Sequence, residues 1–407
     1  MEDKLEDLQS TTKLVVIFTL ILSTIGVIMV YSSSYIFAQE QYGNSNYYFF
    51  KQVSFLSIGT FIAFVISKTK VSFWMKYGHI VNWLMTVFLL ATFFPGFGKV
   101  VKGAKRWLDL GFFGFQPGEI VKYTVLLSAV SLFENFSLFD KNTKINRAVG
   151  IIVPLMLLLL QPDFGSFTIC LIIVLYACFL SSFPRKIFYW GFGVAITALI
   201  PILISQPYRV KRLFAFLDPW KNPQTSGFQI IQSYLGFANG SIFGTGLGNS
   251  NEKLFYLPEA HNDFIFSVIG EELGFIGVFT IVLLFFLFNL FGQKLALLIK
   301  NRSHSIIVSC VVFLISLQAT LNMGVVLGLL PTKGLNLPFI SSGGSSLLAN
   351  AFGIGLILSA INSYRKTLLV QENPFARDEI FSETLPSMSQ TSPSLSEKRF
   401  PASRLPR

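Results

Sequence analysis

The chain has 407 residues, a formal net charge of +11, 52% hydrophobic residues and only 13% charged residues. Soluble domains carry roughly 25% charged residues, so the composition excludes an ordinary soluble globular protein and indicates a chain embedded in a bilayer. Helices are expected there, because unpaired backbone groups cannot face lipid. The long apolar runs differ from the short alternating segments of a membrane β-barrel.

Apolar stretches near the roughly 20 residues that cross about 30 Å of hydrocarbon recur along the chain. The predicted fold class is therefore an all-α polytopic membrane protein with about ten transmembrane helices. The fifth stretch is short for a full crossing. In chain order the expected spans are 14–31, 49–67, 79–95, 117–136, 148–160, 164–182, 186–205, 263–291, 304–330 and 343–362.

We expect one membrane domain, 14–362, between a cytoplasmic amino-terminal segment, 1–13, and a cytoplasmic tail, 363–407. The first apolar run is interpreted as a span rather than a signal peptide, because its leader is acidic where a signal peptide is basic. Beyond about residue 371 the tail has too few large apolar residues for a core, so it is expected to be mostly disordered.

The distribution of Lys and Arg over the loops sets the orientation. Loop 32–48 has neither and is expected outside, which places both termini inside and a large outer loop, 206–262, between spans seven and eight. The long loop can escape the rule, but the short outer loop 96–116 also holds cations. The outer cations are Lys99, Lys102, Lys105, Arg106, Arg209, Lys211, Arg212, Lys221, Lys253 and Lys333.

Two explanations of these outer cations stay open. They could match the charge of an anionic substrate head group, such as the pyrophosphate of a lipid. They could equally attract ordinary anionic lipids, at about 1 kcal/mol per residue near the surface. The residues that we assign to head-group contacts are Lys105, Arg106, Arg209, Arg212 and Lys333.

Segment 103–123, "GAKRWLDLGFFGFQPGEIVKY", predicts a helix start at Pro117, because the first helical turn tolerates a missing N–H. Gln116, Glu119 and Lys122 follow at steps of three, so they share one side of the helix and Glu119 can pair with Lys122. The pair either fixes two helices together or forms the polar wall of a cavity.

Segment 256–273, "YLPEAHNDFIFSVIGEEL", carries acids in or beside an apolar run. Asp263 stands at the outer mouth of the eighth span, where it could act as a base or simply cap the helix. His261 is the histidine with candidate functional neighbours. Glu259 follows Pro258 and is interpreted as a loop residue.

Glu271 and Glu272 come eight and nine residues after Asp263. On a continuous helix they would lie about 12 Å deeper and too far inside to touch a surface hydroxyl. We interpret them as structural polar contacts to a neighbouring span, with a proton or ion path as the alternative.

Other polar segments are assigned by their surroundings. Asp163 in "QPDFG" is interpreted as a turn residue. "SSGGSS", 341–346, including Ser345 and Ser346, could present backbone N–H groups to phosphate or permit close helix packing. Segment 227–240 is mixed enough in polarity to lie flat on the outer interface. The three cysteines have no spacing that suits a metal or disulfides and are interpreted as buried hydrophobes.

These segments resemble, in order, the signatures of the SEDS family (shape, elongation, division and sporulation) of membrane proteins. The matching stretches are "GAKRWLDLG...FQPGEIVK", "QPDFGSF", "YRVKRLFAFLDPWKNP", "GFQIIQSYLGFANGSIFGTGLGNS", "LPEAHNDFIFSVIGEELGFIG" and "LPFISSGGSSLL". "LPEAHNDF" and "PTKGLNLP" are more similar to the division branch of the family than to the elongation branch. Gly118 and Ser342 depart from the family pattern without removing a charge.

The resemblance implies a peptidoglycan glycosyltransferase that polymerises lipid II at the outer face of the cytoplasmic membrane, at the division septum. It implies that Asp263 is the catalytic aspartate, that Arg106 matches the family's strongest basic position, and that undecaprenyl pyrophosphate leaves. Gln116, Glu119, Lys122 and His261 join the expected substrate-binding residues.

The expected partners are lipid II, the growing glycan strand, a class B penicillin-binding protein and other division proteins, with no nucleic acid. No organic cofactor is expected, whereas the family implies use of a divalent cation, Mg or Mn. Two alternatives are a lipid II flippase, which needs charges spread through the membrane depth, and a non-catalytic division scaffold. The scaffold gives no reason for a cationic outer mouth.

Overall fold

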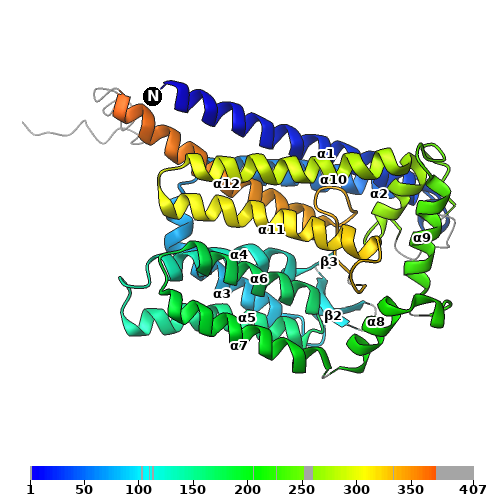
Figure 1. Ribbon diagram of the computed structural model, residues 1–407, viewed down its shortest axis with the longest axis horizontal. Coiled ribbons are helices and arrows are strands. Elements are labelled where there is room, and N and C mark those ends of the chain that lie inside the picture. Colours follow the sequence, from blue (N-terminus) through cyan, green and yellow to red (C-terminus); the bar gives the residue numbers. More distant parts are fainter. Residues whose placement is uncertain are drawn as a thin grey trace, which may run out of the picture.

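In the computed structural model the described residues are 2–372, except 102–103, 110, 112–113, 205, 226, 252–259 and 333. They fold mainly as helices, which Figure 1 shows as a bundle with roughly parallel axes. The helices are α1 (Glu2–Tyr42), α2 (Tyr47–Lys68), α3 (Val71–Ala91), α4 (Pro117–Glu134), α5 (Lys141–Leu160), α6 (Phe164–Leu180), α7 (Arg185–Ile204), α8 (Pro207–Leu217), α9 (Phe228–Gly240), α10 (Ile265–Leu298), α11 (Arg302–Val326) and α12 (Gly344–Glu372), with a 3₁₀ turn at Pro219–Lys221.

Within the described residues, six helices are long and apolar enough to cross a membrane: α1, α2, α5, α10, α11 and α12. This confirms the expectation of an all-α polytopic membrane protein. The four other expected spans, 79–95, 117–136, 164–182 and 186–205, coincide largely with α3, α4, α6 and α7. Their membrane crossing remains an expectation.

Several helix boundaries differ from the expected ones for identifiable reasons. The fifth helix begins at Lys141, well before residue 148, because the Asp140 carboxylate accepts hydrogen bonds from the amides of Asn142 and Thr143 and caps it. This gives the short fifth stretch 20 residues. At the ends of the chain, α1 includes nearly all of segment 1–13 and α12 runs to Glu372, whereas the rest of the expected tail lies outside the described residues.

A small antiparallel sheet interrupts the helical pattern and was not expected. Strands β1 (Gly98–Val101), β2 (Ala104–Asp109) and β3 (Gly114–Phe115) pair in the order β1-β2-β3. Lys99 lies opposite Trp107, and Leu108 lies opposite both Gly98 and Phe115. The sheet occupies the cationic loop before α4.

The sheet, α8 and α9 gather at the end of the bundle opposite the amino terminus (Figure 1). Figure 1 shows α9 crossing this end at a steep angle to the long helices, and its position corresponds to the segment expected to lie flat on the interface. The loop charges predict that the amino terminus is inside, so this end is the expected outer one, and we call it the outer end.

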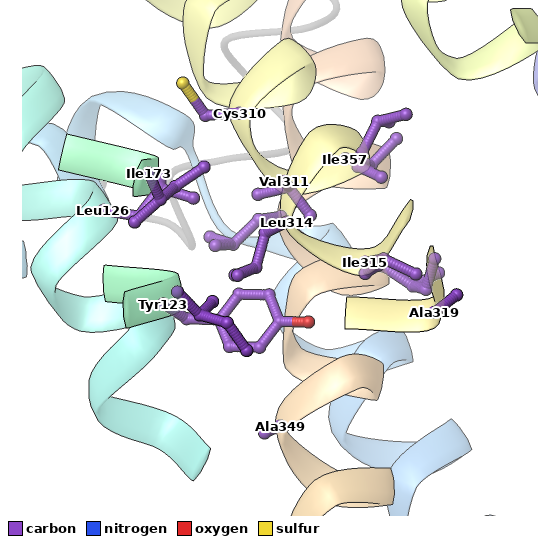
Figure 2. Packing of buried hydrophobic residues seen from close by; sticks show 14 of the residues in the cluster. Tyr123, Leu126, Ile173, Cys310, Val311, Leu314, Ile315, Ala319, Ala349 and Ile357 are labelled. Carbon is purple, nitrogen blue, oxygen red and sulfur yellow. The ribbon is translucent and has the colours of Figure 1, made fainter. Parts of the chain in front are cut away.

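The core lies where α4, α6, α11 and α12 meet. Tyr123, Leu126, Ile173 and Leu314 are each at most 1% exposed, and Figure 2 shows side chains from these helices meeting over several helical turns. The three cysteines are free and buried, as expected for small hydrophobes. This packing holds α4 and α11 together.

A break in α10 joins that helix to the large outer loop. Gly274 has φ 67°, so the helix is interrupted one residue after Leu273. The carbonyls of Glu271 and Glu272 accept from the amides of Thr245 and Gly246, at 2.9 and 3.0 Å. After the break, the amides of Phe275 and Ile276 donate to the carbonyls of Ser241 and Ile242, at 2.9 and 3.3 Å.

Glycines allow this approach of two backbones. A Cβ added at Gly240 would lie 2.0 Å from the carbonyl oxygen of Gly270, and one at Gly244 would lie 2.2 Å from that of Glu272. No side chain fits at such distances. Segment 240–246 therefore replaces the missing helical hydrogen bonds of α10, and we call this contact the glycine joint.

We expect Gly240→Ala to destabilise the protein by about 1–3 kcal/mol, because the new methyl group must displace backbone. The measurement is the apparent unfolding temperature of the purified protein in detergent. Gly191→Ala is the matched control, since nothing lies within 4 Å of a Cβ at that helical position. An unchanged unfolding temperature for Gly240→Ala would contradict the glycine joint.

Candidate functional site

Two amide side chains on α11 hold the centre of the candidate site. Asn322 donates through Nδ2 to the carbonyl of Asp263 at 2.8 Å and to that of Leu335 at 2.5 Å. One turn earlier, Gln318 donates to the carbonyl of Asn336 at 3.2 Å. Both are 1% exposed, so these bonds fix two non-helical segments inside an apolar core.

Every carbonyl of the segment 261–263 is bound. The His261 carbonyl accepts from the amide of Ser342 at 3.0 Å, and the Asn262 carbonyl accepts from the Ser341 hydroxyl at 2.7 Å. The Asp263 carbonyl accepts from Asn322. The backbone under Asp263 is consequently held from two sides, by α11 and by the segment before α12.

Asp263 is partly exposed, whereas Phe264 beside it is buried. The N-cap of α10 is Phe264, which makes no side-chain capping bond, so the capping alternative for Asp263 is not what the structure shows. A Cβ added at Gly334 would lie 3.0 Å from Asp263 Oδ2. The Asp263 carboxylate therefore lies close to the backbone of Gly334, which has no side chain.

The ion pair expected from spacing is present on α4. Lys122 Nζ lies 2.9 Å from Glu119 Oε2, with side-chain exposures of 0% and 8%. Lys122 also donates to Gln318 Oε1 at 2.9 Å. This bond connects the ion pair to α11. Asn322, which holds the Asp263 carbonyl, lies one helical turn further along α11.

The start of α4 is tied to the start of α12. The amide of Gln116 donates to the Ser345 hydroxyl at 3.0 Å. Ser346 lies 3.5 Å from Asn350 Nδ2, and Asn350 accepts from the Tyr123 hydroxyl at 2.7 Å. Ser345 and Ser346 are 3% and 4% exposed.

For the 341–346 segment, close packing is the observed contact. A Cβ at Gly343 would meet Asn336 Nδ2 at 2.2 Å, and one at Gly344 would meet the Phe55 ring at 2.5 Å. The amide of Ser342 is bound to His261. These contacts favour the packing interpretation over a phosphate nest.

Two of the described cations at the outer end, Arg106 and Arg212, contact backbone. Arg106 donates to the carbonyls of Gln161 and Pro162, at 3.2 and 2.5 Å. Arg212 is exposed and donates to the carbonyl of Thr332 at 3.1 Å. Lys105 is exposed on β2. Some predicted residues lie outside the part of the chain that the structure describes. They include the side chain of Arg209 and all of Lys102, Lys253, Glu259 and Lys333.

The remaining acids have structural partners. Asp163 caps α6, accepting from the amide and the hydroxyl of Ser166 at 3.2 and 2.9 Å. Glu272 accepts from the Ser32 hydroxyl of α1 at 2.6 Å. Glu271 accepts from the amide of Asn251 at 3.1 Å and from the Ser250 hydroxyl.

These contacts identify the partners of the two glutamates. Helix α10 is continuous from Ile265 to Leu273 and breaks at Gly274, directly after them. Glu271 is fully buried against outer-loop residues, and Glu272 is fully buried against α1. Both therefore belong to the glycine joint.

Two polar residues of α11, Gln318 and Asn322, were missed by sequence reasoning. They are four residues apart in a mostly apolar helix, which places them on one face. That spacing was the available signal.

Within the described residues, no group of three or more His, Cys, Asp or Glu side chains is arranged to hold a metal ion.

We expect Lys122→Met to destabilise the fold by about 3–5 kcal/mol, because it leaves the Glu119 charge buried and unpaired. The double variant Glu119→Gln/Lys122→Met removes both charges and should recover most of that loss. Apparent unfolding temperatures in detergent measure both effects. A double variant as unstable as the single one would show that the ion pair is not the origin of the effect.

Residues 12–366 match a family profile described as "Cell cycle protein", which is named for FtsW, RodA and SpoVE. A probable peptidoglycan glycosyltransferase FtsW of Coxiella burnetii is 38% identical over 365 residues, covering 84% of this chain and 94% of the relative. One of Saccharophagus degradans is 40% identical over 342 residues, covering 81% and 86%.

Solved structures have the same fold. A chain of a structure described as "Structural coordination of polymerization and crosslinking by a peptidoglycan synthase complex" aligns with TM-score 0.69 and 26% identity, over 86% of this chain and 97% of that one. The rod shape determining protein RodA of Thermus thermophilus aligns with TM-score 0.61 and 24% identity, over 86% and 96%. The chain therefore belongs to the FtsW, RodA and SpoVE family, and its similar relatives carry the name FtsW.

Proposed function

We propose that this protein is a peptidoglycan glycosyltransferase that polymerises lipid II at the outer face of the cytoplasmic membrane, with Asp263 as the general base. The observation that carries the proposal is the anchoring of Asp263. Three consecutive carbonyls, from His261 to Asp263, are each bound, while the Asp263 residue stays partly exposed. A rigid backbone under a partly exposed acid is what general-base catalysis requires.

The reaction forms one bond and breaks another. The acceptor hydroxyl oxygen attacks the anomeric carbon of the donor sugar, and its proton passes to the Asp263 carboxylate. The bond from that carbon to the pyrophosphate oxygen breaks, and undecaprenyl pyrophosphate leaves with the electron pair. A positioned base contributes on the order of 10²–10⁴-fold to such a step. The activated phosphate ester needs no second acid, unlike the leaving group of a glycoside hydrolase.

Cations at the outer end support the departure of the pyrophosphate. Lys105 is exposed on β2, which belongs to the sheet at this end (Figure 1). Arg106 and Arg212 hold the turn before α6 and the segment after α11 while adding positive charge there. Charge placed before the reaction stabilises the growing negative charge without reorganisation. Arg209 and Lys333 complete the proposed head-group contacts on sequence grounds.

A divalent cation fits this site only together with the substrate. The described residues contain no group of three metal-ligating side chains. Mg²⁺ commonly keeps its waters and binds one or two carboxylates plus substrate phosphates, so Asp263 is the residue that could contact it. When bound, such an ion would supply positive charge to the pyrophosphate.

The proposed topology has ten spans, α1 to α7 and α10 to α12, with both termini cytoplasmic. It is supported by the six long apolar helices and by the position of the four others in the same bundle (Figure 1). In this topology 14–362 is the membrane catalytic domain, 206–262 is the outer loop containing α8 and α9, and 363–407 is the tail.

We also propose a transpeptidase partner of the class B penicillin-binding type and a role at the division septum, with other division proteins. The similar structure of a peptidoglycan synthase complex that coordinates polymerization and crosslinking supports the partner. The FtsW names of the relatives support the division role.

The flippase alternative receives less support from the site. It relied on charges spread through the membrane depth, but Glu119 and Lys122 are paired and almost fully buried. Glu271 and Glu272 bind the outer loop and α1. The scaffold alternative leaves the anchored carboxylate of Asp263 without a role.

Asp263→Asn is expected to abolish polymerisation without loss of folding, since the amide keeps the side-chain shape but cannot take a proton. The assay follows conversion of lipid II to glycan strands by purified protein and its partner in detergent, which has no two sides and cannot report flipping. Absence of strands from the wild type, with verified substrate and partner, would overturn the enzyme proposal.

Glu271→Gln is expected to keep polymerisation while lowering stability. Glutamine has one acceptor oxygen, so it can keep the bond from Ser250 or the bond from Asn251 but not both, and it lacks the carboxylate charge. The same polymerisation assay and an unfolding temperature distinguish the two effects. Complete inactivity of a folded Glu271→Gln variant would mean that this carboxylate takes part in the reaction or in substrate transport.

A further inference from the structure

A continuous run of aromatic rings leads from the α1–α2 turn to His261. Tyr42 and Tyr47 stack with centroids 4.1 Å apart and an interplanar angle of 13°. Tyr47 meets Tyr48 edge to face at 5.2 Å, and Tyr48 lies 4.4 Å from the His261 ring. Phe37 of α1 contacts both Tyr48 and His261, at 6.2 and 5.5 Å.

The two ends of this run differ in exposure. Tyr42 and Tyr47 are 50% and 36% exposed, whereas His261 is 6% exposed and lies two residues before Asp263. Lys51 belongs to the run as well, since its ammonium lies 5.7 Å from the ring centres of both Tyr47 and Tyr48. We call these six residues, Phe37, Tyr42, Tyr47, Tyr48, Lys51 and His261, the aromatic track.

Packing explains only the inner end of the aromatic track. Tyr48 and Phe37 support His261, whose carbonyl is tied to Ser342. In the outer stack of Tyr42 on Tyr47, by contrast, both rings keep much of their surface accessible. Single interfacial tyrosines are ordinary in membrane proteins, but here the rings form one path that ends beside the candidate base.

We propose that the outer part of the aromatic track, Tyr42 and Tyr47 with Lys51, binds the sugar rings of the glycan strand next to Asp263. This inference rests on the proposed polymerase function. A pyranose ring has an apolar C–H face and a polar rim, which suits the flat, amphipathic surface of a tyrosine. The Lys51 ammonium complements the carboxylates of the stem peptides that the strand carries.

Stacking has consequences for strand length. A strand held by several weak ring contacts can shift along them without leaving the enzyme, because each contact costs little to break and re-form. The α1–α2 turn would then be a surface that holds the product strand. It would be separate from the outer cations that bind the donor pyrophosphate. Losing it should release strands early while leaving the chemical step intact.

The test compares strand lengths made by full-length protein with its partner in detergent, at equal lipid II consumption. We expect Tyr42→Ala/Tyr47→Ala to shorten strands at least about threefold, in line with the loss of aromatic contacts worth about 0.5–1.5 kcal/mol each. Comparing strands at equal lipid II consumption separates early strand release from any change in the polymerisation rate. Tyr42→Phe/Tyr47→Phe, which keeps the rings, should make strands of nearly wild-type length.

Phe61→Ala is the matched control. Phe61 is a 66% exposed aromatic residue of α2, the helix that begins at Tyr47, and it lies outside the aromatic track. It should leave strand length unchanged. Equal shortening by Phe61→Ala would show a general effect of removing surface rings and would overturn the inference. Unchanged strand length in Tyr42→Ala/Tyr47→Ala would overturn it too, while polymerisation by that variant would leave the proposed function standing.

A second measurement is independent of activity. Saturation-transfer NMR detects binding of a soluble peptidoglycan tetrasaccharide, with or without stem peptides, to the protein. We expect transfer to sugar protons from the wild type and its loss in Tyr42→Ala/Tyr47→Ala, with Lys51→Gln weakening binding only of the form with stem peptides. Equal transfer from wild type and the tyrosine variant would overturn the inference even if the protein proved not to polymerise lipid II.

Discussion

The structure depends on a few amide side chains that satisfy backbone carbonyls inside an apolar core. Asn322 binds the carbonyls of Asp263 and Leu335, and Gln318 binds that of Asn336. A carbonyl left unpaired in such surroundings costs several kcal/mol, so non-helical chain at membrane depth must be buried in protein and fully bonded. One face of α11 meets this requirement for two segments at once, and the candidate base is held as a result.

The same constraint accounts for the glycine joint. Interrupting α10 at Gly274 frees helical donors and acceptors, and segment 240–246 supplies replacements for them. The glycines permit the approach, while the buried carboxylates of Glu271 and Glu272 add bonds to the outer loop and to α1. Segment 240–246 of the expected outer loop is thus hydrogen-bonded to α10, the helix that begins two residues after Asp263.

Features that depend on local spacing were predictable from the sequence. The helix start at Pro117, the Glu119–Lys122 pair and the apolar helices follow from periodicity and neighbouring residues. Asp163 was expected to be a turn residue from the Pro and Gly beside it, and the structure shows it as the N-cap of α6. Asp263 was singled out by its place before an apolar run, although the capping alternative could be set aside only when Phe264 proved to be the cap.

The features that were not predicted depend on contacts between segments that are distant in the sequence. The break at Gly274 is invisible in a long apolar run. The strands at 98–115 are too short to show alternation. Gln318 and Asn322 resemble isolated polar residues until the segments that they bind are placed beside them.

The central claim is that Asn322 positions Asp263, and the most direct measurement is the lipid II polymerisation rate of Asn322→Leu in detergent. Asn82→Leu is the control, because Asn82 is equally buried but binds the carbonyl of Gly150 instead. Misplacement of a catalytic group by about 1 Å can cost on the order of 10²-fold, so we predict a fall of that size for folded Asn322→Leu and a near-normal rate for Asn82→Leu. A wild-type rate in folded Asn322→Leu would contradict the account.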